Sequence, residues 1–70
     1  MSLIGLAQSL DRIASREYPL LNIPIISEIK NVLFKNNKEK FLIYFDKNKA
    51  RIEQYPAIYK SIIKELESNS

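Results

Sequence analysis

The acid–base chemistry open to this chain rests on carboxylates, phenols and amines, because the sequence contains neither histidine nor cysteine. The usual general base and the usual thiol nucleophile are therefore missing. Asp11 and Glu17 are six residues apart and Glu65 and Glu67 are two apart, so neither pair shares a helix face. Gly5 is the only glycine, which excludes a glycine-rich phosphate loop. We expect a protein that is not an enzyme, with no catalytic residues, metal, cofactor or small-molecule substrate.

Basic side chains gather in the middle of the sequence. Residues 30–51 contain seven lysine and arginine residues and two acidic residues, a local net charge of +5 against +3 for the whole chain. Clustered on one side of a fold, such residues bind nucleic-acid phosphates through counterion release. A solvated, lysine-rich face has the same composition, and the sequence leaves both interpretations open. The candidates for contacts with DNA or RNA are Lys30, Lys35, Lys38, Lys47, Lys49 and Arg51.

A chain of 70 residues has to position these groups, and that length is enough for one domain, at residues 1–70. Apolar residues make up 46% of the chain, so it is expected to fold rather than remain disordered. Because so short a chain buries a modest fraction of its surface and has no cysteine or histidine for a disulfide or a zinc site, its stability must come from packing or from a partner.

Apolar residues recur at three- and four-residue steps in three segments, which predicts amphipathic helices at residues 2–17, 23–35 and 56–67. Pro19 ends the first helix, while Pro24 and Pro56 lie in the first turns of the second and the last, where proline is tolerated. The sequence KNNK at 35–38 ends the second helix, because asparagine tolerates left-handed angles and caps the helix that follows. Residues 68–70 are expected to be a frayed tail.

The segment 38–54 admits two structures. As a helix it places Phe41, Leu42, Phe45 and Ile52 on one side, and its second half has helix-favouring residue types. As a β-hairpin at 41–54 it would use the strand-favouring run FLIYF and the turn residues DKNK. We favour the helix, so the predicted fold is an all-α bundle of three to four helices. The alternative is an α+β fold with the hairpin.

With the hairpin, the order helix, helix, hairpin resembles that of winged-helix proteins. The resemblance implies that the helix at 24–35 would lie in a groove of DNA and that DKNKAR, at 46–51, would form the tip of the wing. It therefore implies a small basic protein that binds DNA or RNA through residues 30–51.

A second resemblance is local. The sequence LNIPIISEI, at 21–29, is similar to the entry into the second helix of the theta subunit of bacterial replicative polymerase and its phage counterpart, and Tyr44 and Phe45 compare with an aromatic pair of that family. Those are small helical proteins that sit on a proofreading subunit and have no activity of their own. The resemblance covers nine residues of the chain and implies that an accessory subunit is one use for a protein of this kind.

Several large apolar residues lie off the main stripe of their predicted helix or in the connection 18–24, where they either close the core or form a docking patch. The candidates for a protein interface are Ile4, Leu20, Leu21, Phe34, Ile43, Tyr44 and Tyr59. We expect a non-catalytic module or accessory subunit that docks on a larger protein or pairs with itself. The longest apolar run is too short to span a membrane, so we expect no membrane association and a cytoplasmic location.

Overall fold

A computed structural model describes residues 3–20 and 22–68, and within these ranges every regular element is a helix. The helices are α1 (Leu3–Glu17), α2 (Pro24–Phe34), α3 (Lys38–Lys47), α4 (Lys49–Glu53) and α5 (Pro56–Ser68). The prediction of a small all-α bundle is confirmed. The alternative hairpin at 41–54 is wrong, because that segment forms α3 and α4 and so makes its hydrogen bonds locally.

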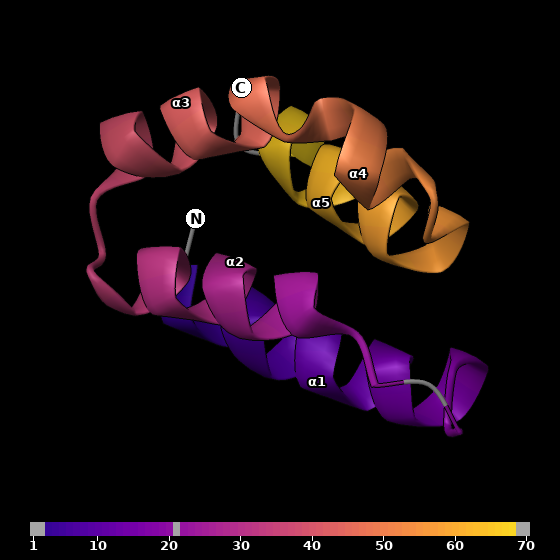
Figure 1. Ribbon diagram of the computed structural model, residues 1–70. Helices are drawn as coiled ribbons and strands as arrows, with labels where there is room; N and C mark the ends of the chain where they lie inside the picture. The colour runs from indigo at the N-terminus through magenta and orange to yellow at the C-terminus, as the bar shows by residue number, and fades with distance from the viewer. Residues whose placement is uncertain (1–2, 21, 69–70) are drawn as a thin grey trace.

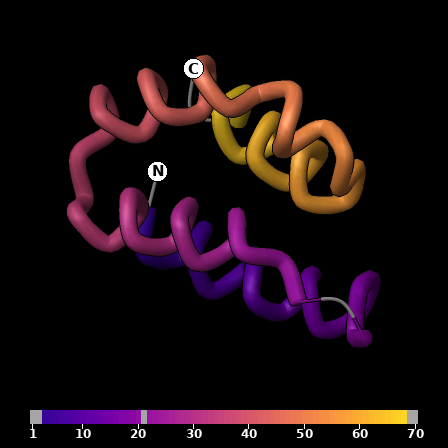
Figure 2. The backbone as a smooth tube through the Cα atoms, in the orientation of Figure 1, coloured from indigo at the N-terminus to yellow at the C-terminus, as the bar shows by residue number. Residues whose placement is uncertain are grey.

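The helices are arranged in two layers around one core (Figure 1). Helices α1 and α2 form an antiparallel pair in one layer, and α3, α4 and α5 form the other (Figures 1 and 2). Helix α1 packs on both α2 and α5, α2 packs on α3, and α4 packs on α5. The contacts between α3 and α5 are sparser than these.

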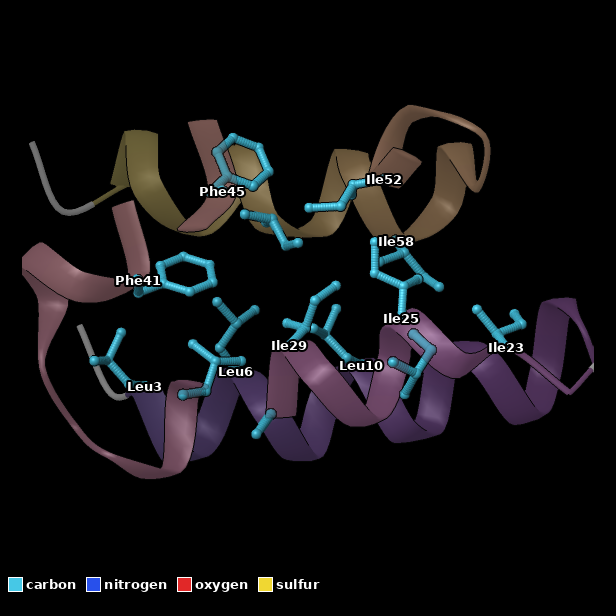
Figure 3. Packing of buried hydrophobic residues seen from close by; sticks show 14 residues of the cluster. Leu3, Leu6, Leu10, Ile23, Ile25, Ile29, Phe41, Phe45, Ile52 and Ile58 are labelled. Atoms are coloured by element: carbon cyan, nitrogen blue, oxygen red, sulfur yellow. The ribbon is translucent and has the colours of Figure 1, made fainter. Parts of the chain in front are cut away.

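The core lies between the two layers and is entirely apolar. Leu3, Leu6 and Phe41 meet at one end of it, and Ile23 marks the other end (Figure 3). Within α1, α2, α3 and α5 the buried residues follow one another at steps of one, three or four, as burial of one helical stripe requires. The buried residues are Leu3, Leu6, Ala7, Leu10, Ile23, Ile25, Ile26, Ile29, Leu33, Phe41, Phe45, Ile52, Ile58 and Ile62.

The turn between α2 and α3 depends on two asparagines. Asn36 has a positive φ of 55°, a left-handed conformation that asparagine tolerates better than most residues. The side-chain oxygen of Asn37 accepts a hydrogen bond from the backbone N–H of Lys40 at 3.1 Å and so caps α3. Both roles predicted for the sequence KNNK are confirmed, and they reverse the chain so that α3 crosses onto the second layer.

The predicted helix at 38–54 is interrupted at Asn48. The side-chain amide of Asn48 donates a hydrogen bond to the carbonyl oxygen of Tyr44 at 3.0 Å, the same oxygen that accepts from the backbone N–H of Asn48. Such side-chain bonds compete with the regular helical pattern. Helix α4 therefore starts in a new direction and brings Ile52, which is 0% exposed, into the core.

Tyr18 and Tyr55 contact each other at the start of α5 and stabilise its position. Their rings pack edge to face with 5.5 Å between centroids, and the hydroxyl of Tyr18 accepts a hydrogen bond from the backbone N–H of Ala57 at 3.3 Å. Helix α5 includes Ser68, one residue of the expected tail. The helix start at Ser2, the apolar Leu21 and the tail residues 69–70 lie outside the described residues.

Candidate interaction surfaces

Four of the residues predicted for a protein interface are exposed. They are Ile4 at 44%, Leu20 at 96%, Phe34 at 51% and Ile43 at 57%. Leu20 belongs to the α1–α2 connection, at one end of the molecule. The start of α1, the end of α2 and α3, which carry the other three residues, form the opposite half (Figure 1). Tyr44 and Tyr59 are half-buried and pack against the core, and Leu21 lies outside the described residues.

Ile4 and Phe34 occupy the same outer side of the α1–α2 pair. The ion pair between Lys30 and Asp11, with 2.8 Å between Nζ and Oδ2, marks the side on which the two helices meet solvent. Ile4 lies seven residues before Asp11 on α1, and Phe34 lies four residues after Lys30 on α2. Each apolar residue therefore points to nearly the same side of its helix as the ion-paired residue there. Because the helices are antiparallel, both residues lie toward the same end of the pair.

Helix α3 adds Leu42 and Ile43 to the exposed apolar residues of this half. Leu42 is 39% exposed, although the sequence places it on the buried side with Phe41 and Phe45. Those two rings, 6.1 Å apart, already fill the core-facing stripe of a helix of 10 residues. Leu42 is thus a surface residue that pattern reasoning missed. The signal for it is its position next to Phe41, outside the four-residue step that Phe41 and Phe45 define.

Tyr44 takes part in a polar cluster that joins three helices. Its hydroxyl donates a hydrogen bond to Oε1 of Glu28 at 3.1 Å, and Nη2 of Arg51 lies 3.2 Å from Oε2 of the same carboxylate. The hydrogen bond from Arg51, followed by that from Tyr44, lowers the pKa of Glu28. Burial, together with the hydrogen bond to Glu28, raises the pKa of Tyr44 to about 12. Glu28 on α2 therefore holds both α3 and α4.

The six basic candidates of residues 30–51 do not lie together on one surface. Lys30 is paired with Asp11, and Arg51 is held by Glu28 and by Oδ1 of Asn48 at 2.9 Å, so both have partners within the fold. The other four candidates are exposed, in two pairs at opposite ends of α3, about 15 Å apart along its axis. They are Lys35 with Lys38 and Lys47 with Lys49. Since DKNKAR spans the α3–α4 break rather than a wing tip, the winged-helix arrangement is absent there, and nucleic-acid binding stays a prediction.

The outer side of α5 carries a shallow depression with a volume of about 370 Å³. It is lined by Tyr59, Lys60, Ile63, Lys64 and Glu67, and a neighbouring depression of about 280 Å³ continues it past Tyr59 toward Pro56 and Glu53. The ring of Tyr59 packs on that of Phe45 with 5.8 Å between centroids. One side of Tyr59 thus belongs to the core, while the other borders this surface.

A third depression, of about 270 Å³, lies between α1 and α2 and is bordered by polar groups such as Ser15, Asn22 and the Lys30–Asp11 pair. In residues 3–20 and 22–68 no group of acidic side chains is arranged to hold a metal ion. Among the same residues, no helix combines the length and the apolar character that crossing a bilayer requires.

Comparison with protein-family models, with curated proteins and with solved structures found no match to this chain. The local resemblance of residues 21–29 to the theta subunit gains no support from these comparisons. Any functional proposal therefore rests on the chain's own residues.

Proposed function

We propose that this protein is a non-catalytic interaction module that docks on a larger protein through exposed apolar residues of α1, α2 and α3. The observation that supports the proposal is the exposure of Ile4, Phe34, Leu42 and Ile43. Exposed large apolar side chains on a small domain are typical of protein-binding surfaces. The core packs without them, so their apolar character is not needed for the fold.

Burial of the exposed apolar side chains against a partner would contribute favourably to the free energy of binding. Complete burial of an isoleucine or phenylalanine side chain contributes about 1.5–3 kcal/mol. Phe34 and Ile43, each more than half exposed, retain at least half of that contribution for a partner. An aromatic residue beside aliphatic ones also suits the apolar centre of an interface, where a few anchors supply most of the affinity.

Affinity capture with matched variants tests this proposal. The tagged full chain, Phe34→Ser and Ile43→Ser are incubated with extract of the native cells, and each retained protein is quantified by mass spectrometry. Asn31→Ser, which changes an exposed polar residue of α2, is the control. We expect one partner that the wild type and the control retain equally. Its affinity for the other two variants should be roughly four- to twelvefold lower, because each loses about 0.8–1.5 kcal/mol of apolar contact.

Circular dichroism of each variant establishes that it is folded. Equal retention of the partner by all four proteins would contradict the proposal. Loss of the retained proteins on nuclease treatment would support the nucleic-acid alternative instead. Location in the cytoplasm stays a prediction.

A further inference from the structure

The side of α3 that faces away from the core carries one apolar residue between four charged ones. Ile43 lies two residues from both Phe41 and Phe45, a little more than half a helical turn, so its side chain points away from the core that these two rings fill. Ile43 is 57% exposed and is not among the residues that pack against the core. We call Ile43 and the charged residues that flank it the α3 outer face. The charged residues are Glu39, Lys40, Asp46 and Lys47.

The four charged residues form two edges of opposite sign along the helix. With a turn of about 100° per residue, Glu39 and Asp46 lie about 40–60° to one side of Ile43, and Lys40 and Lys47 lie about 40–60° to the other. All four residues are exposed, and none of their side chains has a hydrogen bond or ion pair within residues 3–20 and 22–68. Both edges are therefore available to a partner.

The other charged residues of 35–51 lie outside this face. Lys38 is five residues before Ile43, which turns it about 140° away. The rest belong to the connection before α3 or to α4, and one of them is held by Glu28. They are Lys35, Lys49 and Arg51. The two edges thus account for the charge that a helix packed on Ile43 would meet.

The two edges make the α3 outer face complementary to itself in one direction only. A two-fold axis parallel to α3 would bring the acidic edge of each copy against the basic edge of the other. Glu39 would then lie opposite Lys40, and Asp46 opposite Lys47, each at heights that differ by one residue, about 1.5 Å. An antiparallel pair would instead place acidic edge against acidic edge and basic edge against basic edge. Charges that flank an apolar contact set the direction of paired helices in this way.

We infer that the α3 outer face binds the same face of a second copy of this chain, with the two α3 helices parallel and Ile43 packed on Ile43. The inference rests on the proposed function, since Ile43 is a binding residue in both, and adds self-association as a further use of that residue. A standard interface buries about 800 Å² per partner. A helix of 10 residues, about 15 Å long, supplies much less, so the pair is weak and forms at high protein concentration.

Sedimentation of the purified full chain up to millimolar concentration tests the pairing with two double variants of equal net charge. Lys40→Glu with Lys47→Glu makes both edges acidic, so all the charge contacts of the pair become repulsive and association weakens about tenfold. Lys38→Glu with Lys49→Glu makes the same change in net charge at exposed residues outside the face, and should leave association as in the wild type. A general effect of net charge would weaken association of both variants equally.

The direction of the pair can be measured because the sequence contains no cysteine, so that a single introduced thiol forms disulfides only between chains. In a parallel pair, both Ile43→Cys and Lys47→Cys place the two thiols close enough to form a disulfide under mild oxidation. In an antiparallel pair the two copies of position 47 lie about 12 Å apart along the axis, so Ile43→Cys alone would be linked. Lys64→Cys, at an exposed residue of α5, is the control for random collisions.

Three results would overturn the inference. They are a wild-type chain that stays monomeric at millimolar concentration, equal association of the two double variants, and disulfide formation by Lys47→Cys that is no faster than by Lys64→Cys. Phe34→Ser separates this inference from the proposed function, because Phe34 lies outside α3. It should reduce capture of a larger protein and leave self-association unchanged, so failure of one proposal is visible without failure of the other.

Discussion

Ile52 and Ile43 offer a direct test of how the segment 38–54 is packed, because the same substitution at the two positions should have very different effects. Ile52 is 0% exposed and is the only buried residue of α4, a helix of five residues. So short a helix has no independent stability in water, and burial of its apolar side chain has to hold it in place. Ile43 is 57% exposed on α3.

Replacement of each isoleucine by alanine gives the magnitudes. At Ile52 the change removes fully buried carbon atoms and leaves a cavity, which lowers the free energy of unfolding by about 3 kcal/mol. At Ile43 less than half of the side chain is buried, so about 1 kcal/mol of burial is lost. Alanine recovers about 0.4 kcal/mol of this through its higher helix propensity, which leaves a net loss of about 0.5 kcal/mol. A domain of this size has a total stability of roughly 3.5–10 kcal/mol.

Urea denaturation followed by far-ultraviolet circular dichroism measures both values. Ile52→Val, expected to cost about 1 kcal/mol, keeps the series measurable if the Ile52→Ala variant is already partly unfolded. In thermal unfolding, Ile52→Ala should lower the midpoint by about 15 °C and Ile43→Ala by a few degrees. Equal losses at the two positions would refute the packing, because they would mean that Ile43 is as buried as Ile52.

Three further predictions concern polar contacts of α2 and α3. Stability should fall as the pH rises from about 10 to about 12, because the raised pKa of Tyr44 favours its protonated form in the folded state. A difference in unfolding free energy between wild type and Tyr44→Phe that stays constant over this range would contradict the prediction. The pKa of Glu28 is lowered in the folded state, so its contribution to stability is lost as the pH falls below its ordinary pKa of 4.5. Glu28→Gln should therefore reduce the dependence of the unfolding free energy on pH in this acid range. Asn37→Ala should destabilise the protein by about 1 kcal/mol in urea, since it removes the cap of α3, whereas Asn37→Asp should retain most of that stability.

Most of the helical framework could be predicted because it depends on local patterns. The spacing of apolar residues, the three prolines and the asparagines at 36 and 37 place the helix ends within a residue or two. The strand-favouring run FLIYF made the hairpin an open alternative. Packing decided against it, since a four-residue step brings both Phe41 and Phe45 to the core, whereas strand alternation would have put Phe41, Ile43 and Phe45 on one face.

The polar contacts were harder to foresee, because they join residues that are distant in the sequence. Tyr44 and Arg51 meet Glu28 from positions 16 and 23 residues away, and Lys30 meets Asp11 across 19 residues. No spacing rule indicates such pairs. The break at Asn48 was missed for a different reason. The sequence does not indicate whether an asparagine side chain points into solvent or bonds to a backbone carbonyl, as that of Asn48 does to the carbonyl of Tyr44. The exposure of Ile4, Phe34 and Ile43 was predictable from their positions off the buried stripes, while their role stays a prediction.

Binding of a partner to the proposed docking surface should raise the free energy of unfolding of this small domain. Exposed surface pairs contribute about 0–1 kcal/mol each, so the contacts of Glu28 and Asp11 organise the helices but add little to a domain without disulfide or metal. A partner that binds only the folded chain adds about 2.7 kcal/mol when its concentration is one hundred times its dissociation constant. That gain is a large fraction of the roughly 3.5–10 kcal/mol expected for 70 residues. Exposed apolar residues that contribute little to the isolated fold, such as Phe34 and Ile43, would then become the residues that stabilise it once the partner is bound.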